Sequence, residues 1–158
     1  MAAMPKKKPE PWRGASAAVH VRNSRLHGRG VFAREALTSG AVVGVYAGQR
    51  YSPDELEQHV WDDGLTYLFG LSDGSVIDGA IGGNATRFLN HACEPNCEAV
   101  EFYDEDDRLC VRIETLRSIA VGEELTLDYA LQIEDSDPAE HPCNCGATRC
   151  RGTLALPV

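Results

Sequence analysis

Short apolar runs, separated by turns rich in glycine, proline and acidic residues, recur along the chain, and several alternate apolar with polar positions. Runs typical of β-strands occupy residues 19–22, 26–32, 42–46, 67–71, 76–78, 97–102, 109–113 and 125–127. Asp73 and Gly74 predict a hairpin between the fourth and fifth runs, and an acidic turn predicts another between the sixth and seventh. This pattern favours a mainly β domain built from several small sheets.

Helical signals are few. Residues 52–55, Ser-Pro-Asp-Glu, form a capping box with proline at the first helical position, which predicts a short helix toward Gln58. Residues 87–89 are expected to form one helical turn. Because Pro95 cannot continue a helix, residues 90–96 are predicted to be an irregular loop.

Composition limits the classes of protein to consider. The 158 residues are 43% hydrophobic and 25% charged, which is typical of one soluble globular domain. No apolar run approaches the roughly 18 residues needed to span a membrane. Residues 1–15, rich in Lys, Pro and Ala, are predicted to be a disordered leader, and they lack the apolar core of a secretory signal. We expect an intracellular protein, cytoplasmic or nuclear, with export to a host cell left open.

The formal net charge is −9, which argues against direct binding of nucleic acid, since phosphate recognition depends on clustered Lys and Arg. Acidic residues gather at 62–63, 104–107 and 134–137. Each cluster alone is explained by a solvated turn, but together they favour a basic protein or peptide as partner.

The densest chemistry lies in residues 87–97, Arg-Phe-Leu-Asn-His-Ala-Cys-Glu-Pro-Asn-Cys. Asn90 and His91 have fixed hydrogen-bonding geometry and stand beside two cysteines that bracket a Glu-Pro-Asn turn. A polar turn with two core cysteines would explain this stretch as well as a binding site would.

The end of the chain favours the second explanation. Cys143, Cys145 and Cys150 lie within eight residues, too close together for independent buried thiols. A Cys-x-Cys pair presents two thiolates to one metal ion, and Gly146 lets the backbone turn back to deliver a third. Structural zinc takes four ligands. The candidates for the fourth are Cys93, Cys97, Cys110 and His141.

Five motifs follow one another in order: His27-Gly28-Arg29-Gly30, Tyr46-Ala47-Gly48, Asn90-His91-x-Cys93-x-Pro95-Asn96, Leu125-Thr126-Leu127-Asp128-Tyr129, and the cysteines of the tail. This combination resembles the SET-domain protein lysine methyltransferases that carry a cysteine-rich post-SET tail. The resemblance implies a SET domain at 16–132 and a zinc-binding tail at 133–158. It also implies a knot-like fold, in which the signature segment, residues 90–96, is threaded through a loop near 125–129.

The resemblance implies a role for each site residue. Tyr129 and Tyr46 would be the catalytic tyrosines, with Tyr129 facing the transferred methyl group and Tyr46 also lining the lysine channel with Phe69 and Leu127. The cofactor, S-adenosylmethionine, would contact His27, Gly28, Arg29, Gly30, Tyr67, Asn90, His91 and Asn144. Zinc would be bound by Cys93, Cys143, Cys145 and Cys150, which leaves Cys97 and Cys110 as core thiols.

The implied reaction needs an uncharged lysine amine, whereas free lysine has a pKa of about 10.4. A narrow aromatic channel lowers that pKa by desolvation and aligns the amine. The product is a lysine methylated on a basic protein, with a histone tail as a plausible substrate, and the enzyme is expected to be a monomer or weak dimer. Two rival hypotheses are a catalytically silent peptide-binding module and a thiol redox switch.

Three positions depart from the family pattern. Ala92 stands where serine is usual, Val45 where an acid is common, and Leu127 where phenylalanine or tyrosine is usual. Leu127 bears on the product, since a smaller side chain without a hydroxyl group leaves room for further methylation. We therefore expect dimethyl or trimethyl lysine.

Overall fold

The computed structural model describes residues 15–59, 67–130 and 137–156. The expected leader, apart from Ala15, therefore lies outside the described residues, as do the acidic residues 62–63 and most of 134–137.

The strands are β1 (Val19–Asn23), β2 (Arg29–Ala33), β3 (Val42–Val45), β4 (Gln49–Tyr51), β5 (Leu68–Gly70), β6 (Val76–Asp78), β7 (Asn90–His91), β8 (Cys97–Tyr103), β9 (Leu109–Thr115) and β10 (Glu124–Leu127). The helices are α1 (Pro53–Gln58) and the 3-10 turns η1 (Ala85–Phe88) and η2 (Pro138–Glu140). The mainly β architecture of several small sheets is confirmed.

The largest sheet described has the order β1-β2-β10-β7. β1 and β10 flank β2 antiparallel, and β7 joins the far edge of β10 in parallel, with Asn90 opposite Thr126 and His91 opposite Leu127. The prediction of an irregular loop over residues 90–96 was therefore wrong for its first two residues. Asn90 and His91 are buried, and pairing with β10 gives their backbone N–H and C=O groups the hydrogen-bond partners that a buried backbone requires.

A second sheet has the order β3-β9-β8. β9 alternates buried and half-buried residues along its whole length, as expected of a strand with one face toward a core. The hairpin of β8 and β9 is longer than predicted and pairs from Cys97–Thr115 to Tyr103–Leu109. Its acidic turn is stabilised by Asp104, whose carboxylate accepts hydrogen bonds from the backbone N–H groups of Asp106 and Arg108.

The third sheet, β4-β6-β5, contains the predicted hairpin between β5 and β6. β4 was not predicted, because a polar run of Gln, Arg and Tyr carries no alternation of its own. The predicted capping box is confirmed: the Ser52 hydroxyl group accepts the N–H of Glu55, whose carboxylate accepts the N–H of Ser52. These bonds begin α1 at Pro53.

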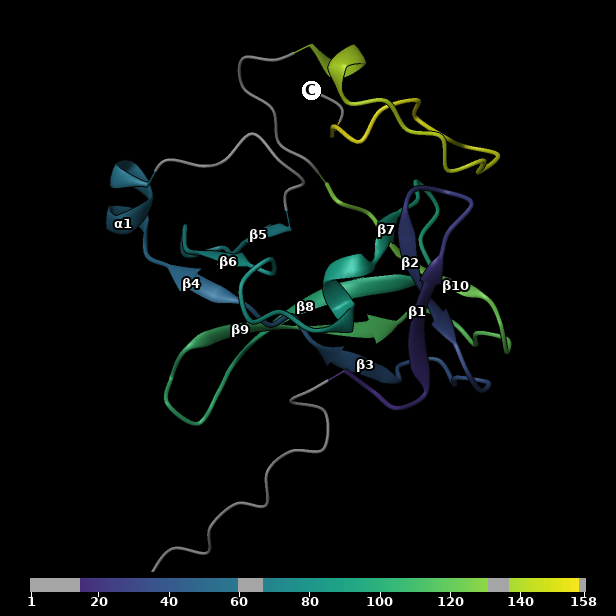
Figure 1. The fold of residues 1–158 in the computed structure, drawn as a ribbon, viewed down its shortest axis with the longest axis horizontal. Helices are drawn as coiled ribbons and strands as arrows, with labels where there is room; N and C mark the ends of the chain where they lie inside the picture. Colours follow the sequence, from purple (N-terminus) through teal and green to yellow (C-terminus); the bar gives the residue numbers. More distant parts are fainter. Residues whose placement is uncertain (1–14, 60–66, 131–136, 157–158) are drawn as a thin grey trace, which may run out of the picture.

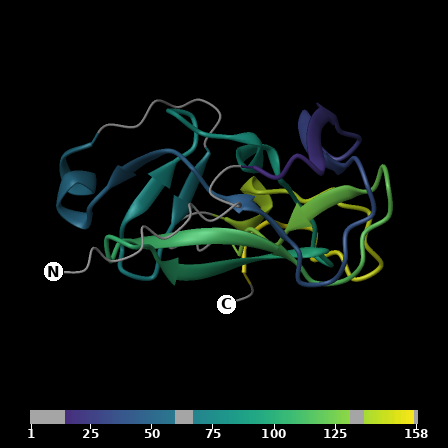
Figure 2. The same ribbon diagram turned by 90° about the horizontal axis from the view of Figure 1, so that it is seen from below.

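The small sheets are arranged around the long β8–β9 hairpin (Figures 1 and 2). The β4-β6-β5 sheet and α1 lie toward one end, and β1, β2 and β10 lie toward the other. One core cluster joins residues from all three sheets, among them Val31, Ile77, Ile113 and Leu125. No helix in the described part of the chain is long and apolar enough to cross a membrane.

Candidate active site and cysteine cluster

The segment that follows η1 is attached to β10 at both of its ends. At one end, β7 pairs with Thr126 and Leu127. At the other, the Asn96 side chain accepts the N–H of Thr126 at 2.8 Å and donates to the carbonyl oxygen of Glu124 at 2.7 Å. The amide of Asn96 thus replaces a neighbouring strand's backbone, which fixes this segment beside the strand that leads to Tyr129.

Tyr129 bonds to this segment through two groups. Its hydroxyl group donates to the carbonyl oxygen of Leu89 at 2.7 Å, and its backbone N–H donates to Nδ1 of His91 at 3.0 Å. Tyr129 is 46% exposed, yet desolvation of the hydroxyl group, followed by the nearby charge of Glu124, raises its pKa to about 12. The phenol is therefore neutral at physiological pH.

His91 links this tyrosine to the cysteines. Because Nδ1 accepts the N–H of Tyr129, the neutral ring carries its hydrogen on Nε2, which lies 3.4 Å from the sulfur of Cys93. Burial lowers the pKa of His91, and the nearby Asp128 carboxylate opposes that shift. The neutral form is the one that fits both contacts.

Tyr46 and Phe69 form an aromatic wall with ring centroids 5.0 Å apart. The Tyr46 hydroxyl group donates to the carbonyl oxygen of Tyr67 at 2.6 Å. Burial raises the pKa of Tyr46, and repulsion from Tyr129 contributes to the shift. Leu127 belongs with Tyr46 to the core cluster, and Phe69 packs against it. Among the predicted channel residues, Tyr46 and Phe69 are therefore in ring contact, and a channel between them and Leu127 stays a prediction.

The side chain of Asn90 bonds to the glycine turn, which is residues 27–30. Its Nδ2 group lies within 3.0 Å of the carbonyl oxygens of His27 and Arg29 and 2.9 Å from a carboxylate oxygen of Glu124. Gly28 has φ +44°, in the region where glycine is least strained. With Nδ2 so engaged, Oδ1 is the atom of Asn90 left to bind a ligand.

Gly30 is needed for a reason internal to the chain. A Cβ at this position would lie 2.1 Å from Oε1 of Glu124. That carboxylate also accepts the hydroxyl group of Ser24 at 2.8 and 2.9 Å. Sequence reasoning missed Glu124; the available signal was a carboxylate at the start of a strand whose other residues are apolar or threonine.

The four predicted metal-binding cysteines come together. The sulfurs of Cys93, Cys143, Cys145 and Cys150 all lie within 4.8 Å of one another. Those of Cys93 and Cys143 are 3.7 Å apart, and those of Cys93 and Cys150 are 3.9 Å apart. Tetrahedral zinc with bonds of about 2.3 Å separates its sulfurs by about 3.8 Å. The donor set therefore fits zinc.

The other candidates for the fourth ligand lie outside this cluster. Cys97 is fully buried, which raises its pKa to about 12, and Cys110 contacts Arg50 and Asp104. The tail reaches the end of the molecule where β7 and β10 lie (Figure 1). Asn144, on this tail, is exposed, as are His27 and Arg29. Their roles toward a cofactor stay predictions.

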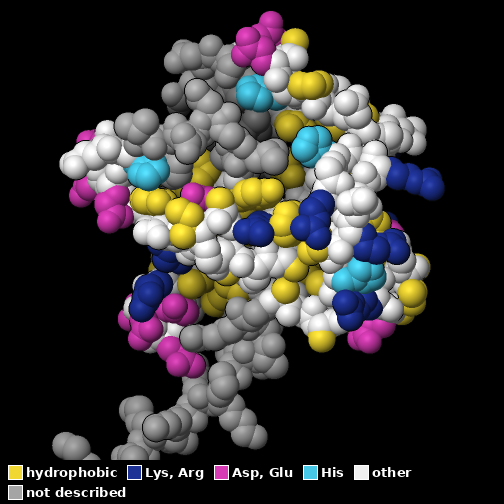
Figure 3. All heavy atoms as spheres, in the orientation of Figure 1, with side chains coloured by type: hydrophobic (Ala, Val, Ile, Leu, Met, Phe, Trp, Pro, Cys, Tyr) yellow, Lys and Arg dark blue, Asp and Glu magenta, His cyan; other side chains and the backbone are white. Residues whose placement is uncertain are grey.

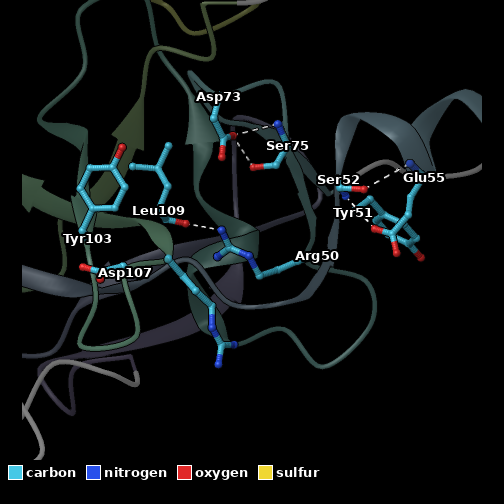
Figure 4. A pocket seen from close by; sticks show the side chains of 10 residues that line it. Arg50, Tyr51, Ser52, Glu55, Asp73, Ser75, Tyr103, Asp107 and Leu109 are labelled. Atoms are coloured by element: carbon cyan, nitrogen blue, oxygen red, sulfur yellow. Dashed lines mark hydrogen bonds between the residues drawn. The ribbon is translucent and has the colours of Figure 1, made fainter.

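A pocket of about 380 Å³ at the α1 end of the molecule contains none of the predicted site residues. Its polar groups already bond to one another: Arg50 donates to the carbonyl oxygen of Leu109, and Asp73 accepts the hydroxyl and N–H groups of Ser75 (Figure 4).

Comparison with known proteins decides the family. The sequence profile of the SET domain matches residues 28–130. The chain belongs to the SET-domain family. The matched range begins at the glycine turn and ends one residue after Tyr129, so it contains the tyrosines, β7 and β10.

Curated proteins are similar to the chain in sequence. The chain is 42% identical over 141 residues to human "Histone-lysine N-methyltransferase 2B" and 39% identical over 140 residues to "Histone-lysine N-methyltransferase trithorax" of Drosophila melanogaster. These matches cover 87% and 86% of this chain but only 5% and 4% of the relatives.

Solved structures agree. Arabidopsis thaliana SUVH6, solved in complex with S-adenosylmethionine (SAM), has a TM-score of 0.76 at 25% identity over 89% of this chain and 34% of that chain. The polycomb repressive complex 2 of Chaetomium thermophilum has a TM-score of 0.66 at 32% identity over 77% of this chain and 16% of that chain.

Proposed function

We propose that the protein is an S-adenosylmethionine-dependent protein lysine N-methyltransferase. One observation carries the proposal: the phenols of Tyr46 and Tyr129, both inside the matched SET domain, donate their hydrogens to backbone carbonyl oxygens. Each phenol oxygen keeps lone pairs and has no hydrogen left for a substrate. Such oxygens are acceptors, suited to the N–H groups of an amine and to a positively charged centre.

When bound, S-adenosylmethionine supplies the methyl group. The protein's task is to present a neutral amine and to align it. The raised pKa values keep both phenols uncharged, so the walls of the site hold no phenolate that would stabilise a lysine ammonium ion. Desolvation between Tyr46, Phe69 and Tyr129 therefore lowers the pKa of the lysine, and the phenol oxygens orient its nitrogen.

We assign cofactor binding to the glycine turn and β7. Asn90 holds the turn through Nδ2 and directs Oδ1 to the cofactor, while His27, Gly28, Arg29 and Gly30 provide its backbone wall. The resemblance adds Tyr67, His91 and Asn144 to this contact set.

Zinc bound by Cys93, Cys143, Cys145 and Cys150 would crosslink the tail to the signature segment. Its chemistry here is structural, because four thiolates leave no open position for substrate. Metal binding would then be part of the folding of the tail. The division into a SET domain at 16–132 and a zinc-binding tail at 133–158 belongs to this proposal.

Histones in the nucleus are the proposed substrates. The named relatives are histone-lysine methyltransferases, and the chain carries a net charge of −9, which attracts basic tails. On the face in Figure 3, acidic side chains lie mostly toward the edges, hydrophobic side chains lie across the middle, and basic side chains lie in both places. A basic peptide would be attracted by the acidic side chains and desolvated by the hydrophobic ones.

The test is incubation with labelled S-adenosylmethionine and a panel of basic proteins that includes histones. Each positive substrate peptide is repeated with its lysines replaced by arginine, which keeps the charge and removes the acceptor amine. We expect label on lysine peptides and none on the arginine versions. Cofactor binding without transfer to any substrate would contradict the proposal and favour a peptide-binding module.

A further inference from the structure

An ion pair joins the tail to the segment directly after β10, which contains Tyr129. The guanidinium group of Arg151 donates two hydrogen bonds to the carboxylate of Asp128, at 2.9 and 3.0 Å. This is the two-pronged geometry that makes arginine–carboxylate pairs strong and directional. The side chains are 24% and 31% exposed, so the pair is partly shielded from water.

The same carboxylate also bonds to the backbone of the residue that follows Tyr129. Oδ1 of Asp128 accepts the N–H of Ala130 at 2.9 Å. Ala130 has φ +48°, a left-handed conformation that is unfavourable for a residue with a Cβ and that persists only when its surroundings fix it. Oδ1 also lies 3.6 Å from Nδ1 of His91, which accepts the N–H of Tyr129. Asp128 therefore holds the residue after Tyr129 and lies beside the His91 nitrogen that accepts the Tyr129 N–H.

Arg151 contacts the cysteine cluster as well. Its backbone N–H donates to the sulfur of Cys93 at 3.3 Å, and it directly follows Cys150. Arg151 thus bonds the cysteine cluster through its backbone and the segment after β10 through its side chain.

We infer that Arg151 and Asp128 are positioning residues, which transmit closure of the tail to Tyr129. The inference rests on the proposed methyltransferase function and adds a regulatory link to it. With the tail docked, the pair fixes Asp128, Asp128 fixes the turn at Ala130, and the Tyr129 phenol is held against Leu89. With the pair broken, the tail still carries its cysteines, but the turn after Tyr129 loses its support.

The experiment compares zinc-loaded full-length variants: Arg151→Gln, Asp128→Asn, the double variant, and Arg149→Gln. Arg149 is an exposed arginine two residues from Arg151 on the same tail, with no ion pair among the described residues, and serves as the matched control. Each variant is measured for zinc content, for kcat and KM, and for hydrogen exchange of the Tyr129 and Ala130 amides.

We expect Arg151→Gln to keep its zinc, to lower kcat about tenfold with a smaller change in the KM for S-adenosylmethionine, and to speed exchange at both amides. Arg149→Gln should change none of these. The double variant should lose no more activity than the worse single variant, because each change removes the same Arg151–Asp128 ion pair.

Three results would overturn the inference: loss of zinc from Arg151→Gln, unchanged kcat with unchanged exchange, or fully additive losses in the double variant. If the unaltered protein methylates nothing, the proposed function fails. Amide exchange at Tyr129 and Ala130 still decides whether the pair positions this turn.

Discussion

The hydroxyl group of Tyr129 donates a 2.7 Å hydrogen bond to the carbonyl oxygen of Leu89, the residue just before β7. The phenol oxygen is thereby fixed with its lone pairs free. We predict that Tyr129→Phe lowers turnover about a hundredfold, the scale of losing one preorganised polar group in an active site. Stability should fall by only about 1 kcal/mol, since one hydrogen bond is lost. Steady-state kinetics and denaturant unfolding measure the two effects.

Tyr103→Phe is the matched control for this change. Tyr103 is 69% exposed at the end of β8 and lies outside the proposed site, so the same loss of a hydroxyl group should leave turnover unchanged. Near-normal turnover in Tyr129→Phe would move the catalytic role to another residue.

A second prediction concerns Gly30, where a Cβ would meet Oε1 of Glu124 at 2.1 Å. Gly30→Ala should displace this carboxylate from Asn90 and disturb the turn that Asn90 holds. We expect stability to fall by about 1–3 kcal/mol, typical of an overpacked site, and the affinity for S-adenosylmethionine to fall with it. Thermal unfolding and calorimetric titration of the cofactor are the measurements.

Gly70 offers the comparison, because a Cβ there meets nothing within 4 Å and its backbone is not left-handed. Gly70→Ala should bind the cofactor normally. A Gly30→Ala protein with unchanged cofactor affinity would mean that Glu124 and Asn90 do not shape the binding turn.

The sequence predicted the parts of the fold that depend on local pattern. The alternation in β9 and the turn signals at Asp73-Gly74 and at the acidic residues after β8 identified the two hairpins, and Ser52 identified the start of α1. β7 could not be predicted this way. Its two residues become a strand only because β10, more than thirty residues later in the chain, pairs with them.

The candidate site shows the same division. Cysteine spacing predicted three zinc ligands but left four candidates for the fourth, and only the family resemblance selected Cys93. Contacts between distant positions, such as Arg151 with Asp128 and Glu124 with Asn90, leave no periodic or spacing signal. They follow from how β10, β7 and the tail meet in space.

The third prediction is one zinc ion per chain, bound by the four clustered thiols. Cys93→Ser should release the metal, loosen the tail and depress activity together, because the cluster joins residues 50 and more positions apart. Metal analysis by mass spectrometry with parallel activity assays checks this. Cys110→Ser alters a half-buried thiol outside the cluster and should retain the metal. Full zinc content in Cys93→Ser would refute the assignment of the fourth ligand.

The last prediction concerns the number of methyl groups added, and it depends on Leu127. This side chain is 5% exposed and belongs to the same core cluster as Tyr46. In the SET-domain enzymes that the chain resembles, a tyrosine at this position can hold the amine or a water molecule through its hydroxyl group and crowd the channel. Leucine has no hydroxyl group and is smaller, so a methylated amine has room to rotate and present its lone pair again. We therefore expect dimethyl or trimethyl lysine from the unaltered protein.

Two variants separate the effect of size from that of the hydroxyl group. Leu127→Phe adds a ring alone, whereas Leu127→Tyr adds the ring and an acceptor oxygen. We expect Leu127→Tyr to shift the product toward monomethyl lysine, and Leu127→Phe to retain more of the higher states, since it cannot hold the amine or a water molecule. Both enlarge a buried position, so their folding is verified by thermal unfolding before products are compared. Mass spectrometry of one substrate peptide over a long time course gives the distribution, and an unaltered enzyme that stops at monomethyl lysine would contradict the role given to Leu127.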